Sequence, residues 1–281
     1  MSDADERRTG PDNPGRPSAR PSPPFSATWH LLLDSAGAPG WRNMSLDQAM
    51  LDLAEHDGHG YFRLYRWQPH GLSFGRNEPA LRRYDRSSIE TLGIEVVRRP
   101  TGGRAVWHGE ELTYAIAAPS LWFGTLAEAY RTIHEMLAEA LGRLGVDAAP
   151  APHRGERAGL GTGACFATPA GGELLVGGRK VLGSAQLRHG DSMLQHGSLL
   201  LGGSQRRITE LTAGPAPESG ETTLSAILGR AVPFEEAAEA ILSSARMWEG
   251  RWHESGAREA LAARATRHEA KFRSTEWTWR R

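Results

Sequence analysis

Two kinds of apolar periodicity alternate along the chain, and together they predict both helices and strands. The clearest helix spans residues 125–144, where apolar side chains recur about every 3.6 residues. An earlier helix is predicted to start at Ser45, because Ser45 and Gln48 fit a capping box ahead of an apolar face. Gly58 and Gly60 predict its end. Further helices are predicted at residues 86–92, 234–248 and 258–272.

Shorter apolar runs between these helices predict strands. The pair Gly177-Gly178 separates two of the runs and is typical of a hairpin turn, which favours antiparallel pairing. Strands and helices do not alternate as regular βαβ units. The predicted fold class is therefore α+β, a mixed or antiparallel β-sheet with packed helices. The predicted strands are 29–33, 61–67, 72–74, 94–98, 112–118, 173–176, 181–187 and 192–200.

The first residues of the chain differ in composition from the rest. Residues 1–27 are rich in Pro, Gly, Arg, Ser and Asp and contain almost no large apolar side chains before Phe25. Such a segment buries too little apolar surface to offset the conformational entropy that ordering costs. We therefore expect a disordered N-terminal extension over 1–27 and one domain over 28–281.

Charge and motif content exclude several classes of function. The chain has 33 Lys plus Arg and 33 Asp plus Glu, so its net charge indicates no general affinity for nucleic acid or membranes. It contains no apolar run of roughly 18 residues, and its acidic start lacks the pattern of a secretory signal. We expect a cytoplasmic protein. Phosphate-binding P-loop, serine-hydrolase elbow and zinc-protease motifs are absent, so no metal or nucleotide site is predicted.

The single cysteine, Cys165, is either an inert buried residue or a nucleophile. One thiol forms no internal disulfide and no cysteine-rich zinc site. Lys180 follows it at the start of a predicted strand, where a lysine is usually solvated. Inside a pocket, its ammonium would lower the pKa of a neighbouring thiol and so favour the nucleophilic thiolate. Composition by itself leaves both alternatives open.

A second candidate segment runs from Arg98 to His108 and contains Gly102-Gly103 between arginines. Paired glycines let a backbone approach a ligand closely and expose amide donors. The alternative is an exposed hairpin turn with solvated arginines. His196, in the predicted strand 192–200, is interpreted as a structural histidine with satisfied ring nitrogens rather than a proton-transfer group.

The order of these motifs resembles that of the lipoate–protein ligase and octanoyltransferase superfamily, which also includes biotin–protein ligases. The resemblance covers the chain from about Trp29 onwards. Cys165 and Lys180 are similar in position to the catalytic pair of the cysteine-dependent octanoyltransferases of the Bacillus type. No Asn-Asp pair, which the ATP-dependent ligases typically carry, occurs in this chain. The matching segments are 43–49, 72–75, 98–114, 178–186 and 276–278.

The resemblance implies a function. Cys165 would receive an octanoyl or lipoyl group from acyl carrier protein as a thioester. A lysine of a lipoyl-carrier domain, such as a glycine-cleavage H protein or a dehydrogenase E2 subunit, would then accept it. Lys180 would lower the thiol pKa, and no cofactor would take part. The alternatives are an ATP-dependent lipoate ligase, a lipoyl amidotransferase between carriers, or a non-catalytic carrier-binding protein. The implied substrate-binding residues are Arg98, Thr101, Gly102, Gly103, Arg104, His108, Gly183, Ser184, Ala185 and Gln186.

Overall fold

The computed structural model describes residues 21–151, 173–213, 220–254 and 256–281. Cys165 lies outside these described residues. The strands are β1 (Thr28–Ala38), β2 (Gly60–Trp67), β3 (Gly71–Phe74), β4 (Glu95–Arg98), β5 (Val106–His108), β6 (Glu111–Pro119), β7 (Ala149–Pro150), β8 (Leu174–Val176), β9 (Arg179–His189), β10 (Ser192–Leu200) and β11 (Arg251–Glu254). The helices are α1 (Gly40–Asp57), α2 (Ala80–Arg83), α3 (Arg86–Thr91), η1 (Ser120–Trp122), α4 (Leu126–Arg143), α5 (Arg207–Glu210), α6 (Leu224–Leu228), α7 (Phe234–Ala245), α8 (Arg258–Arg273) and α9 (Thr275–Thr278).

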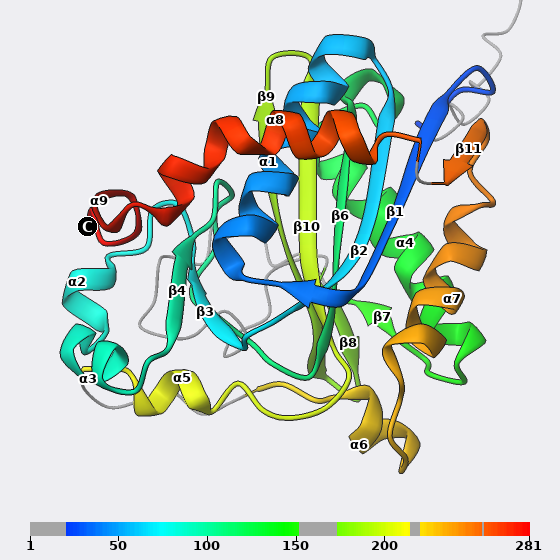
Figure 1. The fold of residues 1–281 in the computed structure, drawn as a ribbon. Coiled ribbons are helices and arrows are strands. Elements are labelled where there is room, and N and C mark those ends of the chain that lie inside the picture. Colours follow the sequence, from blue (N-terminus) through cyan, green and yellow to red (C-terminus); the bar gives the residue numbers. More distant parts are fainter. Residues whose placement is uncertain (1–20, 152–172, 214–219, 255) are drawn as a thin grey trace, which may run out of the picture.

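A large mixed sheet forms the centre of the molecule, with strand order β11-β1-β2-β6-β10-β9-β8-β7 (Figure 1). Strand β1 pairs in parallel with β2 and β11, while the ladders from β2 through β6, β10, β9 and β8 to β7 are antiparallel. A second, smaller sheet has the order β4-β3-β5. The predicted α+β class with a mixed sheet is confirmed.

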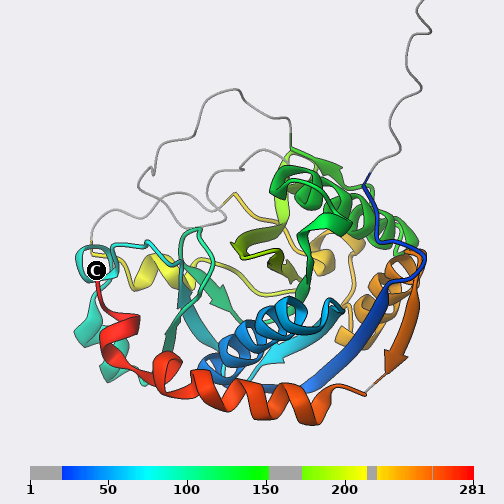
Figure 2. The same cartoon turned by 90° about the horizontal axis from the view of Figure 1, so that it is seen from above.

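Helices cover both faces of the large sheet. Helices α1 and α8 pack together over one face, and α4 and α7 pack together over the other (Figures 1 and 2). Strand β6 shows how the sequence specifies two cores: Leu112, Tyr114 and Ile116 face the α4 side, whereas Ala115 and Ala117 face the α1 side. Side chains alternate between faces along a strand, so a continuously apolar strand serves both layers.

The first helix begins earlier than predicted. Helix α1 starts at Gly40, with Pro39 at its N-cap position, so the predicted start at Ser45 is wrong. The Ser45 hydroxyl lies inside the helix and donates to the carbonyl of Trp41 at 2.8 Å. Proline restricts the backbone to a φ that suits a helix entrance, and this signal outweighed the capping-box pattern. The predicted end is confirmed, because Gly58 adopts φ +72° as the C-cap.

The predicted hairpin at Gly177-Gly178 is confirmed. Both glycines have positive φ, +56° and +77°, and they connect the antiparallel pair β8 and β9.

The two sheets were not predicted as separate units, since the pattern of one strand does not show which strands pair with it. The boundary expected at residue 27 remains a prediction, although Ala27 itself is buried. In the described part of the chain, no helix is long and apolar enough to cross a membrane.

Candidate active site

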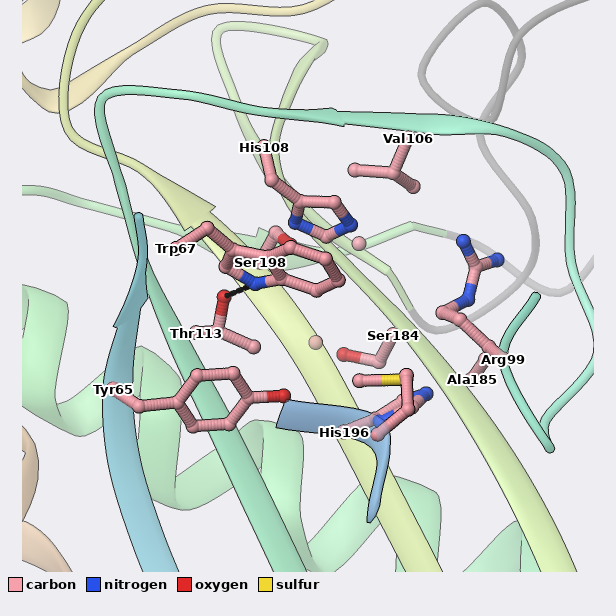
Figure 3. A pocket seen from close by; sticks show the side chains of 13 residues that line it. Tyr65, Trp67, Arg99, Val106, His108, Thr113, Ser184, Ala185, His196 and Ser198 are labelled. Atoms are coloured by element: carbon pink, nitrogen blue, oxygen red, sulfur yellow. Dashed lines mark hydrogen bonds between the residues drawn. The ribbon is translucent and has the colours of Figure 1, made fainter. Parts of the chain in front are cut away.

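A pocket lies where the small sheet meets the large one, above the start of α1. The pocket is narrow, with a cavity volume of about 30 Å³. Figure 3 shows Tyr65 and Trp67 of β2 on one side and Arg99 on the other. The pocket is lined by Met44, Tyr65, Trp67, Arg99, Val106, His108, Thr113, Gly183, Ser184, Ala185, His196, Gly197 and Ser198.

His108 forms part of the pocket wall that β5 contributes. Its ring stacks on Trp67 with centroids 3.6 Å apart and 8° between the planes. Its Nε2 lies 2.6 Å from the Ser73 hydroxyl, and its Nδ1 lies 2.6 Å from a carboxylate oxygen of Glu111. Burial lowers the pKa of His108, despite the opposing effect of Glu111. A neutral ring with the proton on Nδ1 satisfies both partners.

Glu111 accepts hydrogen bonds from side chains of three strands beneath the pocket. The same oxygen that faces His108 also accepts hydrogen bonds from Thr113 at 2.6 Å and from Ser198 at 3.1 Å. Thr113 in turn accepts a hydrogen bond from the indole of Trp67 at 3.0 Å, the dashed contact in Figure 3. Glu111 is only 3% exposed, so these hydrogen bonds are shielded from solvent and hold the side chains of the pocket wall in place.

The loop between β4 and β5 is held to the pocket by Arg99. One guanidinium nitrogen donates to the Ser73 carbonyl and hydroxyl, at 3.0 and 2.6 Å. The other donates to the carbonyls of Gly102 and Arg104, at 3.1 and 2.8 Å. Arg99 lines the pocket and was not among the predicted site residues, although the sequence places it in the same arginine pair as Arg98.

A buried chain of polar groups links this loop to α1. The Thr101 hydroxyl lies 2.6 Å from Nε2 of His196, and Nδ1 of His196 lies 2.8 Å from a carboxylate oxygen of Asp47. That oxygen also accepts a hydrogen bond from Tyr65 at 2.8 Å, while the other oxygen of Asp47 faces Arg63 at 3.3 Å. Both ring nitrogens of His196 have partners, as the interpretation of a satisfied histidine requires, yet His196 also lines the pocket.

Arg98 lies apart from the pocket. Its fully buried guanidinium donates to main-chain carbonyls of two segments, at Gly75–Glu78 and at Trp277–Thr278. Burial and the neighbouring Arg280 lower the pKa of Arg98 to about 10, so the group stays protonated near pH 7. Arg98 therefore ties the chain's C-terminal segment to the loop after β3. The contact between Arg98 and substrate stays a prediction.

Lys180 is the second residue of β9 and is fully buried. Its ammonium donates to a carboxylate oxygen of Glu173 at 2.5 Å. The sequence-based alternative of a solvated lysine is therefore wrong, because neighbouring strands and Glu221 enclose the start of β9. The predicted nucleophile Cys165 lies outside the described residues, so the distance between thiol and ammonium stays a prediction.

Strand β9 continues from Lys180 into the pocket floor. Gly183, Ser184 and Ala185 line the pocket, whereas Gln186 bonds to Gln195 at 2.8 Å and does not line it. The Ser184 hydroxyl forms hydrogen bonds with Nε2 of His134 in α4 at 2.8 Å and with the hydroxyl of Tyr114 in β6 at 2.7 Å. Of the other predicted residues, Gly102, Gly103 and Arg104 belong to the loop that Arg99 holds, and they are not among the pocket-lining residues.

Gly197 of β10 was missed by sequence reasoning. A Cβ atom there would lie 2.5 Å from the Gly183 carbonyl oxygen, 2.5 Å from the Ser184 hydroxyl and 2.7 Å from the Tyr114 ring. Only glycine fits this place in the pocket floor. The His-Gly-Ser sequence at this position was the only available signal, and it carries no information about the neighbouring strands.

Comparison with known proteins gives this arrangement a class. Residues 39–246 match the family model of the lipoyl protein ligase A/B catalytic domain, and the chain belongs to this family. Protein Ta0514 from T. acidophilum with bound lipoic acid has a TM-score of 0.73, is 20% identical, and is matched over 90% of this chain and 99% of that one. Lipoate-protein ligase A bound with ATP has the same TM-score at 18% identity, over 90% of this chain and 98% of that one. These two structures share the fold.

Curated relatives narrow the class. Octanoyltransferase LipM of Carboxydothermus hydrogenoformans is 42% identical over a match that covers 62% of this chain and 65% of that protein. Octanoyltransferase LipM of Kyrpidia tusciae is 33% identical over 90% of this chain and 99% of that protein. The predicted superfamily, its octanoyltransferase type and the acyltransferase class are confirmed by these relatives.

Among the described residues, no group of three or more His, Cys, Asp or Glu side chains is placed to hold a metal ion.

Proposed function

We propose that this protein transfers an octanoyl group from acyl carrier protein to a lysine of a lipoyl-carrier domain, through a thioester on Cys165. The acceptors we propose are glycine-cleavage H protein or a dehydrogenase E2 subunit, and the cytoplasm is the proposed location. The observation that carries the proposal is the position of Lys180. It is a fully buried cation on the strand whose residues 183–185 form the pocket floor.

The proposed chemistry has two acyl transfers. Lys180 stabilises Cys165 as thiolate, since a nearby ammonium favours the charged sulfur. The thiolate attacks the thioester carbonyl of the donor, a carbon–sulfur bond forms to Cys165, and the donor's carbon–sulfur bond breaks. The carrier thiol leaves as a thiolate and takes a proton from solvent. Because a thioester is already activated, the transfer consumes no ATP.

The second transfer regenerates the enzyme. The neutral amine of the carrier lysine attacks the acyl-Cys165 carbonyl, a carbon–nitrogen bond forms, and the bond to the Cys165 sulfur breaks. The amine loses one proton to solvent, and the sulfur returns to the thiolate state beside Lys180. The order of the two steps predicts ping-pong kinetics. The apolar wall around Trp67 and Met44 suits a saturated acyl chain, because such a chain gains free energy on leaving water.

The proposal is tested by intact mass. The protein is incubated with octanoyl-acyl carrier protein without ATP, beside Cys165→Ala and Cys165→Ser. The expected result is a gain of one octanoyl group on the wild type that hydroxylamine removes and that Cys165→Ala lacks. Cys165→Ser should retain, at most, an ester that resists mild hydroxylamine.

Three other outcomes separate the alternatives. No adduct together with lipoate transfer that needs ATP would identify a ligase, and Cys165→Ala would then keep most activity. Transfer only from an already lipoylated carrier would identify an amidotransferase. Carrier binding without any acyl transfer would identify a binding protein. Each of these results refutes the proposal of octanoyl transfer from acyl carrier protein.

A further inference from the structure

Four cationic side chains gather where the C-terminal segment meets the small sheet. This basic cluster consists of Arg76, Lys271, Arg280 and Arg281. Its members influence one another electrostatically: burial lowers the pKa of Lys271, and Arg76 and Arg280 lower it further. Burial also lowers the pKa of Arg280, with Arg281 and Arg76 adding to the effect. The chain as a whole has zero net charge, so this excess of positive charge belongs to the basic cluster and not to the protein in general.

Trp277 packs against two of the four cationic groups, those of Lys271 and Arg280. The Lys271 ammonium lies 4.2 Å from the centroid of the Trp277 ring, and the Arg280 guanidinium lies 4.0 Å from it. Cation–π attraction offsets part of the repulsion between the two cations. The indole of Trp277 donates to the Arg98 carbonyl at 2.9 Å, which fixes the ring. Trp277 belongs to the last segment of the family motif, and no step of the proposed chemistry uses it.

The nearby carboxylates accept hydrogen bonds from other side chains, although Asp52 also acts on Lys271 and opposes the lowering of its pKa. Asp52 accepts a hydrogen bond from His268 at 2.7 Å, and Glu276 accepts one from Ser274 at 2.6 Å. Within the described ranges, no carboxylate lies within 4.0 Å of a cationic group of the basic cluster. Arg76, Arg280 and Arg281 are exposed. The basic cluster therefore presents positive charge to solvent, which favours an anionic partner.

The basic cluster adjoins the loop at the pocket. The backbone N–H of Arg76 donates to the Thr101 carbonyl at 2.7 Å. Next to it, Gly75 lies so close to the loop that a Cβ there would be 1.8 Å from the Gly103 carbonyl oxygen. Thr101 bonds to the pocket-lining His196, as described above. Figure 1 shows the C-terminal segment, α9, beside the small sheet that carries this loop.

We propose that the basic cluster docks an acidic face of the acceptor carrier domain and presents its lysine to the pocket. This inference rests on the proposed function. A lysine reaches the acyl group through only a four-carbon stem, so the folded carrier must touch the enzyme beside the pocket. Contacts between opposite charges at the rim then orient the carrier and accelerate encounter.

Binding of the unacylated acceptor provides the test, since it needs no acyl chemistry. A glycine-cleavage H protein with an acidic lysine-bearing face is titrated into wild type, into Arg76→Glu/Arg280→Glu and into a control. The control, Arg131→Glu/Arg188→Glu, changes net charge equally at exposed positions on α4 and β9. The double variant should lose at least about tenfold in affinity, and the control less than about twofold. Wild-type affinity should fall as salt rises from 50 to 300 mM, with a weaker dependence in the double variant.

The kinetic readout separates this proposal from the proposed function. With saturating donor, Arg76→Glu/Arg280→Glu should raise the acceptor KM by about tenfold, leave kcat within about twofold, and leave the rate of Cys165 acylation unchanged. Equal losses in variant and control, an unchanged acceptor affinity, or slowed acylation by the donor carrier alone would overturn the docking proposal. Failure to acylate Cys165 in every protein would instead refute the proposed function, and the binding result would still decide the docking site.

Discussion

Replacement of Asp47 by asparagine tests the buried chain that connects α1 to the pocket loop. In the described part of the chain, the three groups that contact the Asp47 carboxylate are donors: Nδ1 of His196, the Tyr65 hydroxyl and the Arg63 guanidinium. An asparagine of the same shape offers one acceptor oxygen and one amide that only donates. In Asp47→Asn, at least one buried donor therefore faces another donor.

The cost follows from burial. Asp47 and Arg63 are both 0% exposed, so water does not replace the missing acceptor. An unsatisfied buried donor costs about 1–3 kcal/mol. Removal of one partner of a buried ion pair costs about 3–5 kcal/mol. Arg63 keeps Asp34 at 2.7 Å and the Asn43 side chain at 2.8 Å, which moderates the second effect. We expect a loss of about 2–4 kcal/mol in the free energy of unfolding.

Urea denaturation of Asp47→Asn measures this loss directly. The matched control is Asp52→Asn on the same helix, whose side chain is 22% exposed and pairs with His268. An ion pair near the surface contributes less than about 1 kcal/mol, so the free energy of unfolding of Asp52→Asn should remain close to that of the wild type. Because His196 also positions Thr101, Asp47→Asn should reduce kcat/KM for octanoyl transfer by about tenfold at temperatures where it stays folded. A loss of stability equal to that of the control would refute the reasoning.

Three further predictions address the pocket. In Lys180→Met, the Cys165 thiol should return to a pKa of about 8.5, so the acylation rate at pH 7 should fall about 30-fold and recover toward pH 9; a loss that is independent of pH would contradict the electrostatic role. Gly197→Ala forces a Cβ against the Gly183 carbonyl, so it should cost about 1–3 kcal/mol of stability and raise KM for octanoyl more than for butyryl donors; equal effects on both donors would argue against a role in chain accommodation. The lowered pKa of buried His108 means that the unfolded state binds more protons below about pH 6.5, so stability should fall as pH drops from 7 to 5. Urea denaturation across this pH range measures the change in the free energy of unfolding with pH, and this change should be smaller in His108→Gln than in the wild type. Identical changes in the two proteins would assign the pH dependence to other groups.

Local patterns predicted the elements whose causes are local. The helix predicted at 125–144 is α4, and Thr125 with Glu128 forms its capping box. The hairpin at Gly177-Gly178 and the strand at 192–200 also match the structure, because turn chemistry and alternation act over a few residues. The predicted start of α1 was wrong, since the capping-box pattern at Ser45 competed with Pro39, whose restricted φ suits the position before the helix.

The candidate site was only partly accessible to sequence reasoning. The loop around Thr101 and the strand 183–185 were predicted to lie near the substrate, and 183–185 line the pocket. Asp47 and Gly197 were not predicted, because each acts through a neighbour that is distant in sequence. Glu111 was not predicted either, because it joins the nearby His108 to Ser198, which lies 87 positions away. Asp47 and His196 are separated by 149 positions, and no local pattern records that they meet.

The sequence by itself determined the family, the α+β class and the candidate catalytic pair, because those depend on ordered motifs and on local periodicity. The tertiary structure alone decided which polar groups are buried together. It placed Arg98 against main-chain carbonyls, Arg99 in the pocket, and Trp277 beneath two cations. The physical reason is that strand pairing and helix packing bring distant segments within hydrogen-bonding range, and burial then sets the strength of each contact.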